Sequence, residues 1–394
     1  MARPIYRPVF TAIALSVLTV AGATAQSTAK KAAPAGLSKA ERAAYDRAVA
    51  KGINYLLTKG RNADGAYSPE VGSAITAIAT TALLKHGRSP DDPQIAKSLK
   101  YLEAAVQADG GVYSKDSRMP NYETCIALIC FASANKDGRY DQQIERAEKY
   151  IKGLQFDGEE GHDESSIDYG GAGYGGKSRP DLSNTAMLLD ALQAAGRTAD
   201  DEAVKKAMTF VSRCQNLESE KNTTKFAAKI EDGGFFYTPA AGGSSPAGTG
   251  PAGGLRSYGS MTYAGLKSMV FGGVKQDDPR VKAALKWLSQ HYTLDENPGL
   301  GQAGLYYYYH LMAKSLAAMD QPTFEDAAKK KHDWRKEMIA ALLERQRADG
   351  AWVNPDNKWM EGDANLVTAF ALLTLDYCDP ADKADAKTPA AKAR

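Results

Sequence analysis

The stretch "SAITAIATTALL", residues 73–84, decides the fold of this 394-residue chain, because small and apolar residues occupy nearly every face of the helix it predicts. Two later stretches, "ETCIALICFASA" (residues 123–134) and "LVTAFALLTL" (residues 366–375), have the same character. A helix that is apolar all round belongs in the interior of a protein. We therefore expect a layer of buried helices.

The buried helices alternate with amphipathic ones such as "DQQIERAEKYIKG" (residues 141–153), and Gly/Asp-rich loops such as "ADGAY" (residues 63–67) join them. This unit recurs six times. The second helices are predicted to begin near Ser73, Tyr122, Leu182, Ser260, Ala303 and Asn365. A threonine marks the same early position in five of them, namely Thr76, Thr124, Thr185, Thr262 and Thr368. The pattern predicts an all-α (α/α)6 toroid whose inner-helix N-termini surround a central cavity.

The two ends of the chain have different compositions from the repeats. Arg3, Arg7 and an apolar run over residues 9–21 precede a small-x-small site at residues 23–25, which predicts a signal peptide over residues 1–25. Residues 26–40 and 379–394 have few large apolar residues and are predicted to be a disordered linker and tail. The toroid then spans residues 41–378, and the mature chain is expected to be secreted or periplasmic.

The charge balance and the cysteine spacing argue against several classes of binding partner and metal site. The 49 basic residues include two in the predicted signal peptide, so the rest equal the 47 acidic residues. This balance argues against nucleic acid or an anionic membrane surface as the main partner. No other apolar stretch approaches the length of a membrane span. The cysteines at positions 125, 130, 214 and 378 lack metal-site spacing and are expected to be buried thiols, although a disulfide at Cys214 remains open.

The loops "QADGGVY" (residues 107–113), "RADGAWV" (residues 347–353) and "GGAGYGG" (residues 170–176) are similar to the prenyltransferase/squalene oxidase repeats of the squalene–hopene cyclase and protein prenyltransferase β-subunit superfamily. The resemblance covers about residues 43–378. It implies the toroid fold and a cavity for an isoprenoid.

The stretch "DLSNTA", residues 181–186, departs from both chemistries of that superfamily. Its cyclases carry D-x-D-D-T-A, in which the middle Asp protonates the substrate, and Ser183 stands at that position here. A serine hydroxyl is too weak an acid to protonate an alkene. Its prenyltransferases carry D-x-C as zinc ligands, and Ser183 again replaces the critical residue, so no metal and no cofactor are predicted.

Three carboxylates near inner-helix starts, Glu123, Asp181 and Asp363, are the candidate catalytic residues. In a closed ring they would converge across the cavity and act as an acid/base pair. Alternatively, they cap helix N-termini, with Asn184 reaching back to Asp181. Both interpretations remain open at this point.

The candidate ligand contacts are mainly aromatic. The stretch "GLYYYYHLMAKSL" (residues 304–316) places four tyrosines on one inner helix, either in the core or as an aromatic wall. The residues predicted to contact a ligand are Tyr174, Ser183, Asn184, Tyr258, Tyr306, Tyr307, His310 and Trp359. Long insertions around residues 162–180 and 238–257 are either a lid or solvent loops.

Three functions remain. The first is a terpenoid cyclase/prenyltransferase-like protein that binds or transforms an isoprenoid or other apolar small molecule. The second is a secreted polysaccharide lyase, for which Tyr174, Lys177 and Arg179 would supply the basic and tyrosyl groups. The third is a non-catalytic binding or scaffolding module, which the serine at position 183 favours.

Overall fold

A computed structural model describes residues 36–158, 161–175 and 178–379. These described residues form one compact unit. The predicted signal peptide and the tail beyond Asp379 lie outside the described residues. The first helix begins at Lys39, within the stretch expected to be a linker, and its N-cap Ser38 forms a reciprocal capping box with Glu41.

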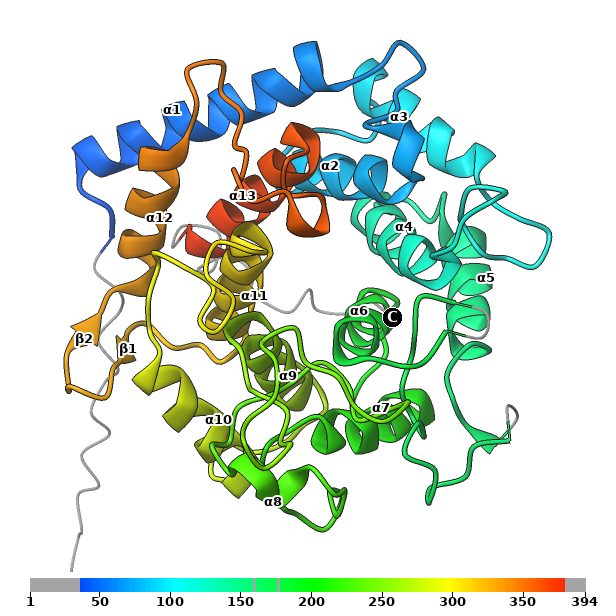
Figure 1. Cartoon of the computed structure of the whole chain (residues 1–394). Coiled ribbons are helices and arrows are strands. Elements are labelled where there is room, and N and C mark those ends of the chain that lie inside the picture. Colours follow the sequence, from blue (N-terminus) through cyan, green and yellow to red (C-terminus); the bar gives the residue numbers. More distant parts are fainter. Residues whose placement is uncertain (1–35, 159–160, 176–177, 380–394) are drawn as a thin grey trace, which may run out of the picture. The chain divides into compact units, whose positions relative to one another are not determined.

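Twelve long helices form six hairpins, as the repeats predicted (Figure 1). The outer helices are α1 (Lys39–Tyr55), α3 (Pro93–Ala104), α5 (Asp141–Lys152), α7 (Glu202–Arg213), α10 (Pro279–Gln290) and α12 (Trp334–Arg345). The inner helices are α2 (Ala74–Lys85), α4 (Pro120–Ala134), α6 (Leu182–Ala194), α9 (Gly259–Phe271), α11 (Leu305–Ala318) and α13 (Ala364–Cys378). Each inner helix contacts the next one along the chain, and α13 contacts α2, so the ring closes. The predicted all-α toroid is confirmed.

Short elements decorate the loops. They are the helical turns η1 (Leu56–Gly60), η2 (Pro69–Val71), α8 (Ala227–Ile230) and η4 (Lys358–Met360), and the strands β1 (Phe324–Glu325) and β2 (Lys331–His332). The two strands pair antiparallel, with Phe324 opposite His332. These strands lie at the outer edge of the ring, beside α12 (Figure 1).

Burial follows the predicted layers. Every residue of α2 from Ala74 to Leu83 is buried, whereas the outer helix α5 buries only Ala147, Glu148 and Ile151. All four cysteines are buried among the apolar side chains of the core. The hydrophobic core therefore lies between and around the inner helices.

The recurring threonine anchors the loop that precedes its helix. In the first repeat the Thr76 hydroxyl accepts a hydrogen bond from the Tyr67 N–H at 2.9 Å. The same bond recurs from Val112 to Thr124, Ala172 to Thr185, Phe235 to Thr262 and Trp352 to Thr368. Each bond satisfies a buried backbone donor that would otherwise cost stability.

The loop glycines pack against the neighbouring outer helix. Gly350 has φ of 93°, and a Cβ there would lie 2.4 Å from the Lys51 carbonyl oxygen of α1. Gly65 makes the equivalent approach to Lys97 of α3. Because Gly350 belongs to the sixth repeat and Lys51 to the first, this contact also closes the outer layer.

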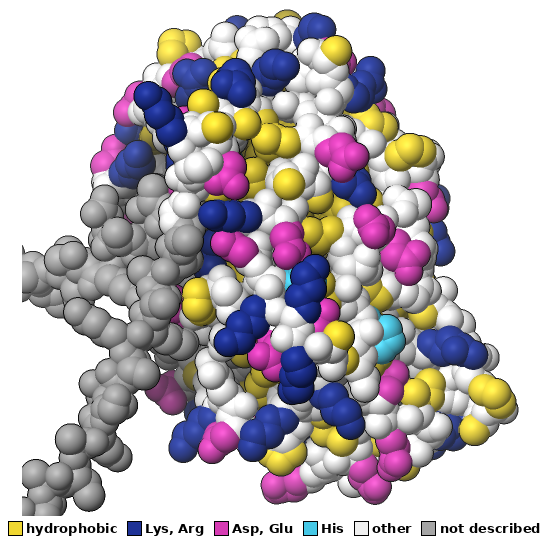
Figure 2. Space-filling view, turned by 90° about the vertical axis from the view of Figure 1, so that its left-hand side faces the viewer, with side chains coloured by type: hydrophobic (Ala, Val, Ile, Leu, Met, Phe, Trp, Pro, Cys, Tyr) yellow, Lys and Arg dark blue, Asp and Glu magenta, His cyan; other side chains and the backbone are white. Residues whose placement is uncertain are grey.

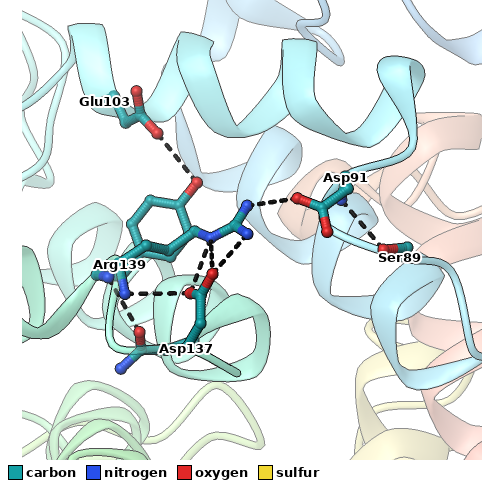
Figure 3. Close-up of polar contacts among 7 residues, drawn as sticks. Ser89, Asp91, Glu103, Asp137 and Arg139 are labelled. Atoms are coloured by element: carbon teal, nitrogen blue, oxygen red, sulfur yellow. Dashed lines mark hydrogen bonds and ion pairs between the residues drawn. The ribbon is translucent and has the colours of Figure 1, made fainter.

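Charged side chains link the repeats on the outside. Arg139 lies between Asp137 of its own loop and Asp91 of the preceding repeat, with 2.7 Å to each carboxylate (Figure 3). Beside it, the Tyr140 hydroxyl donates to Glu103 of α3 at 3.0 Å. On the face in Figure 2, basic and acidic side chains lie intermixed, without a large area of one sign.

Candidate functional site

A cavity of about 540 Å³ opens at the N-terminal end of the inner helices, and we call it the upper cavity. Its aromatic lining residues are Tyr122, Tyr174, Tyr237, Tyr258, Tyr307, Trp359 and Phe370. Its aliphatic lining includes Val71, Ile75, Ile78, Met119, Met261, Met360 and Leu366. Aromatic and aliphatic walls with few polar groups are typical of small-molecule sites, and the volume lies in their usual range.

Both long insertions contribute to the wall of this cavity. Tyr174 and Arg179 come from the first insertion, and Ser244 and Pro246 come from the second. The exposed Arg179 guanidinium lies 5.9 Å from the centre of the Tyr237 ring. The insertions are thus parts of the site. Lys177, the basic residue predicted beside Arg179, lies outside the described residues.

Ser183 lines the upper cavity in the first turn of α6. Its hydroxyl lies 3.0 Å from the Tyr307 hydroxyl on α11, so the two side chains join opposite parts of the wall. Burial raises the pKa of Tyr307 above its ordinary range, against the effect of this hydrogen bond. Ser183 and Tyr307 therefore form a pair of neutral hydroxyl groups on the cavity wall.

Asp181 does not line the cavity but caps the N-terminus of α6. Its Oδ1 accepts the Asn184 N–H at 2.8 Å, and its Oδ2 accepts the Asn184 side-chain amide at 2.7 Å. Burial raises the pKa of Asp181 to about 6, although Asn184 and Tyr237 oppose the shift by hydrogen bonding. Asn184 is buried behind the wall as well. The helix start thus has the capping arrangement that the sequence left as one of two interpretations.

The other two predicted catalytic carboxylates also cap helices, and neither lines the cavity. Glu123 accepts hydrogen bonds from both the N–H and the hydroxyl of Ser73, each at 2.7 Å, at the start of α2. Asp363 accepts from the Asn365 and Leu366 N–H groups at 2.8 and 2.9 Å at the start of α13. The expected convergence across the cavity does not occur, because unpaired N–H groups at helix starts bind these carboxylates instead.

The four consecutive tyrosines of α11 point in different directions. Tyr307 alone among them lines the upper cavity. Tyr306, predicted as a ligand contact, is buried and packs edge-on against Tyr309, with ring centres 5.8 Å apart. Tyr308 donates its hydroxyl to the Thr293 carbonyl at 2.8 Å. His310 lies deeper in the ring, against a second cavity described below.

Glu361 lines the upper cavity and was missed by the sequence interpretation. It is 1% exposed and accepts hydrogen bonds from the N–H groups of Tyr306 (3.1 Å) and Tyr307 (2.8 Å) and from the Asn354 amide (2.7 Å). Burial raises its pKa, against those hydrogen bonds. It is the only carboxylate on the cavity wall among the described residues. Its position two residues before Asp363, at an inner-helix start, was the available signal.

Trp359 stands at the cavity mouth in a strained loop. Trp359 and Met360 have φ of 54° and 67°, a left-handed conformation that non-glycine residues rarely adopt. Such residues cost about 1–3 kcal/mol each and persist where the surroundings hold them, often at functional sites. Trp359 is 45% exposed, and its ring lies over Gly304, where an added Cβ would be 3.0 Å away.

The comparisons with known proteins agree with this architecture. Residues 68–238 match the squalene-hopene cyclase C-terminal domain family. A type II terpene cyclase from Scytonema, in complex with its substrate geranylgeranyl dihydroxybenzoate, has a TM-score of 0.54 at 13% identity over 86% of this chain and 99% of that one. The predicted resemblance to the squalene–hopene cyclase and prenyltransferase superfamily is thereby confirmed.

Proteins with other activities share the same toroid. A glycosidase in complex with glucose has a TM-score of 0.51 at 13% identity, covering 88% of this chain and 100% of that one. A polysaccharide lyase has a TM-score of 0.52 at 12% identity, covering 89% and 99%. No curated protein sequence matches the chain. At these identities the solved structures show a common fold, so the function must be argued from the site.

Among the described residues, no group of three or more His, Cys, Asp and Glu side chains is arranged to hold a metal ion. None of the described helices combines the length and apolar character that crossing a membrane requires.

Proposed function

We propose that this protein binds an isoprenoid-like apolar small molecule in the upper cavity. The observation that carries the proposal is the wall itself, in which seven aromatic side chains and a set of aliphatic ones surround about 540 Å³. Burying an apolar chain there removes hydrocarbon surface from water, which is favourable in proportion to the area buried. The tyrosine rings add faces that attract cationic or polarised groups.

We further propose that binding, and not proton-initiated cyclisation, is the role of the site. Ser183 stands where cyclases of the superfamily place the donor, and its hydroxyl pairs with that of Tyr307. Glu361, the carboxylate on the described wall, accepts hydrogen bonds from two N–H groups at the start of α11 and from the side-chain amide of Asn354. On the basis of the predicted signal peptide over residues 1–25, we propose that this binding takes place in the periplasm or outside the cell.

A polysaccharide lyase or related carbohydrate enzyme is the second candidate, because Tyr174 and Arg179 line the same cavity and such enzymes share the fold. Two features favour the apolar ligand. A glycosidase ordinarily needs a pair of carboxyl groups across the scissile bond, whereas the described wall offers Glu361 alone, and this observation bears on hydrolysis only. Sugar hydroxyls that face the aliphatic side chains of the wall would also lose hydration without gaining partners there.

Trp359 offers a direct test of the proposal. Trp334 and Trp352 are fully buried and Trp287 is nearly so, whereas Trp359 is exposed at the cavity mouth. Farnesol added to the purified mature chain should therefore change the exposed component of tryptophan fluorescence in a saturable way, and cellotetraose should not. The Trp359→Phe variant should lose the signal yet still bind farnesol by equilibrium dialysis.

Two variants on α11 separate the cavity from the rest of the helix. Tyr307→Ala removes a wall residue, whereas Tyr306→Ala removes a neighbour that faces away. Farnesol affinity should fall about tenfold or more in the first variant and change little in the second, since each lost apolar contact of this size contributes more than about 1.4 kcal/mol. Saturable binding of cellotetraose with no binding of farnesol would overturn the proposal.

A further inference from the structure

A second, smaller cavity lies deeper in the ring, and we call it the lower cavity. It has a volume of about 80 Å³, several times the 10–15 Å³ that one water molecule needs on a comparable measure. Ile78, Tyr307 and Phe370 line both cavities, so these three side chains form the partition between them. Lys85, in the last turn of α2, is exposed and also lines the lower cavity, which therefore lies toward the C-terminal ends of the inner helices.

The lower cavity has a charged wall inside an apolar ring. Asp190 of α6 lies 2.5 Å from the Lys267 ammonium of α9 and 2.8 Å from the Lys314 ammonium of α11. Lys267 is 4% exposed and Asp190 is 9% exposed. Charged groups are rarely buried to this extent without a pairing or a function.

The charges of this wall do not balance. Among the described residues, three ammonium groups line the lower cavity, on Lys85, Lys267 and Lys314, against one carboxylate, on Asp190. The two ammonium groups lower the pKa of Asp190 to about 2 although burial opposes them, and burial lowers the pKa of Lys267 to about 8. At neutral pH the buried triad thus carries one excess positive charge. An uncompensated charge in a site of low dielectric constant attracts an anion.

A hydrogen-bond donor and an apolar floor complete the wall. The Nδ1 atom of His310 is buried and has no hydrogen-bond partner among the described residues. Burial and the nearby Lys314 lower the pKa of His310 to about 3, so the ring is neutral at pH 7 and one of its nitrogens carries a donor proton. Ile126, Ile129 and Leu311 supply hydrocarbon surface on the same wall.

We infer that the lower cavity is a carboxylate-binding site, in which Lys267 and Lys314 hold the anion, His310 donates to it, and the isoleucines pack against its hydrocarbon part. The carboxylate comes either as a free short-chain acid or as the acidic end of the ligand in the upper cavity, which would reach it past Tyr307. The second source rests on the proposed function, whereas the first is independent of it.

Titration with acetate at constant ionic strength tests whether a free short-chain carboxylate binds in the lower cavity. A ligand that binds only the folded state raises the melting temperature in a saturable manner. Sodium acetate should do so relative to sodium chloride in the wild-type chain and in Lys286→Met, a control on the exposed side of α10. In Lys314→Met, which leaves Asp190 paired with Lys267, the acetate affinity should fall about tenfold or more because a charged hydrogen bond is lost.

A comparison of farnesoic acid with farnesol tests whether the carboxylate is the acidic end of the ligand in the upper cavity. If the acidic end of a longer ligand occupies the site, farnesoic acid should bind about tenfold or more tightly than farnesol, and Lys314→Met should abolish that preference. The conservative His310→Phe variant, which keeps the ring and removes the donor, should weaken acetate or farnesoic acid in the same direction. Acetate binding without farnesol binding would refute the proposed function and leave this inference standing.

The inference fails on a clear result. Equal effects of acetate and chloride in every variant, together with equal affinities for farnesoic acid and farnesol, would show that the triad is a structural ion cluster. Retained acetate affinity in both Lys314→Met and His310→Phe would show that the anion binds elsewhere.

Discussion

Two buried aspartates, one at the start of α6 and one within it, have pKa values shifted in opposite directions. Asp181 caps the start of α6, where burial raises its pKa to about 6 against hydrogen bonds from Asn184 and Tyr237 and the charge of Arg179. Asp190 lies nine residues further along, about 13 Å at the usual helical rise, where two lysines lower its pKa to about 2 against burial. Burial alone therefore does not decide the charge state of a carboxyl group; the neighbours that the ring brings to it do. The wall of the lower cavity thus contains a buried ion cluster, whereas Asp181 lies behind the wall of the upper cavity as a helix cap.

The largest expected effect on stability comes from removing Asp190, the carboxylate of the ion cluster in the lower cavity. Asp190→Ala leaves the buried ammonium group of Lys267 and its neighbour Lys314 without their carboxylate. Removing one partner of a buried ion pair costs about 3–5 kcal/mol, and we expect that loss in the free energy of unfolding at pH 7. Urea denaturation monitored by circular dichroism measures it.

An exposed ion pair provides the matched control. Asp91 pairs with Arg139 at 2.7 Å, but its side chain is 68% exposed (Figure 3). Asp91→Ala should cost less than about 1 kcal/mol, since solvent screens such pairs. Equal losses of unfolding free energy in Asp190→Ala and Asp91→Ala would show that the buried triad is not desolvated. The contrast between the two aspartates of α6 would then disappear.

The pH dependence of stability should separate the two aspartates by sign. The folded pKa of Asp190 lies below the ordinary value, so its stabilisation is present above about pH 4 and is lost as the pH falls toward 2. The folded pKa of Asp181 lies above the ordinary value, so the folded state binds more protons between about pH 4 and 6. The contribution of Asp181 is therefore favourable at low pH and is lost as the pH rises through about 6.

Asp181→Asn tests this sign without removing the cap, since asparagine is an equally good N-cap. The Asn184 amide oxygen has no hydrogen-bond partner among the described residues, so this amide can rotate to accept from the new side chain. The stability of the variant relative to wild type should rise by about 2 kcal/mol between pH 4 and pH 7, measured as urea denaturation at each pH. A relative stability that falls over this range would mean that Asp181 ionises more readily in the folded chain.

The sequence predicted the architecture well because its signals are local and repeated. A threonine early in the inner helix and an Asp-Gly turn before it mark five of the six hairpins, and in each of the five a loop N–H donates to the threonine hydroxyl, as Ala172 does to Thr185. Positions next to inner-helix starts, such as Ser183 and Tyr258, reached the cavity wall for the same reason. The capping carboxylates were harder to predict, because a carboxylate at a helix start has the same sequence pattern whether it faces the cavity or the backbone.

The parts that sequence reasoning missed depend on contacts between neighbouring repeats that lie far apart in the sequence. Glu361 faces the upper cavity because the chain adopts a left-handed conformation at Trp359 and Met360, which no residue type there signals. The lower cavity combines Asp190 of α6 with Lys267 of α9, and the packing of these two neighbouring inner helices brings the side chains together. A charge within an otherwise apolar inner helix was the available signal.

The smallest expected effect on stability and on ligand affinity comes from a substitution of Ser183 in the upper cavity. Ser183→Ala removes a partly buried bond between two neutral hydroxyl groups, so the free energy of unfolding should fall by less than about 1 kcal/mol. The Tyr307 ring would stay on the wall, and farnesol affinity should remain within about threefold of wild type, a change below about 0.7 kcal/mol. A tenfold loss of farnesol affinity at unchanged stability would instead make the Ser183 hydroxyl a direct ligand contact, and the upper cavity would then recognise a polar group as well as a hydrocarbon chain.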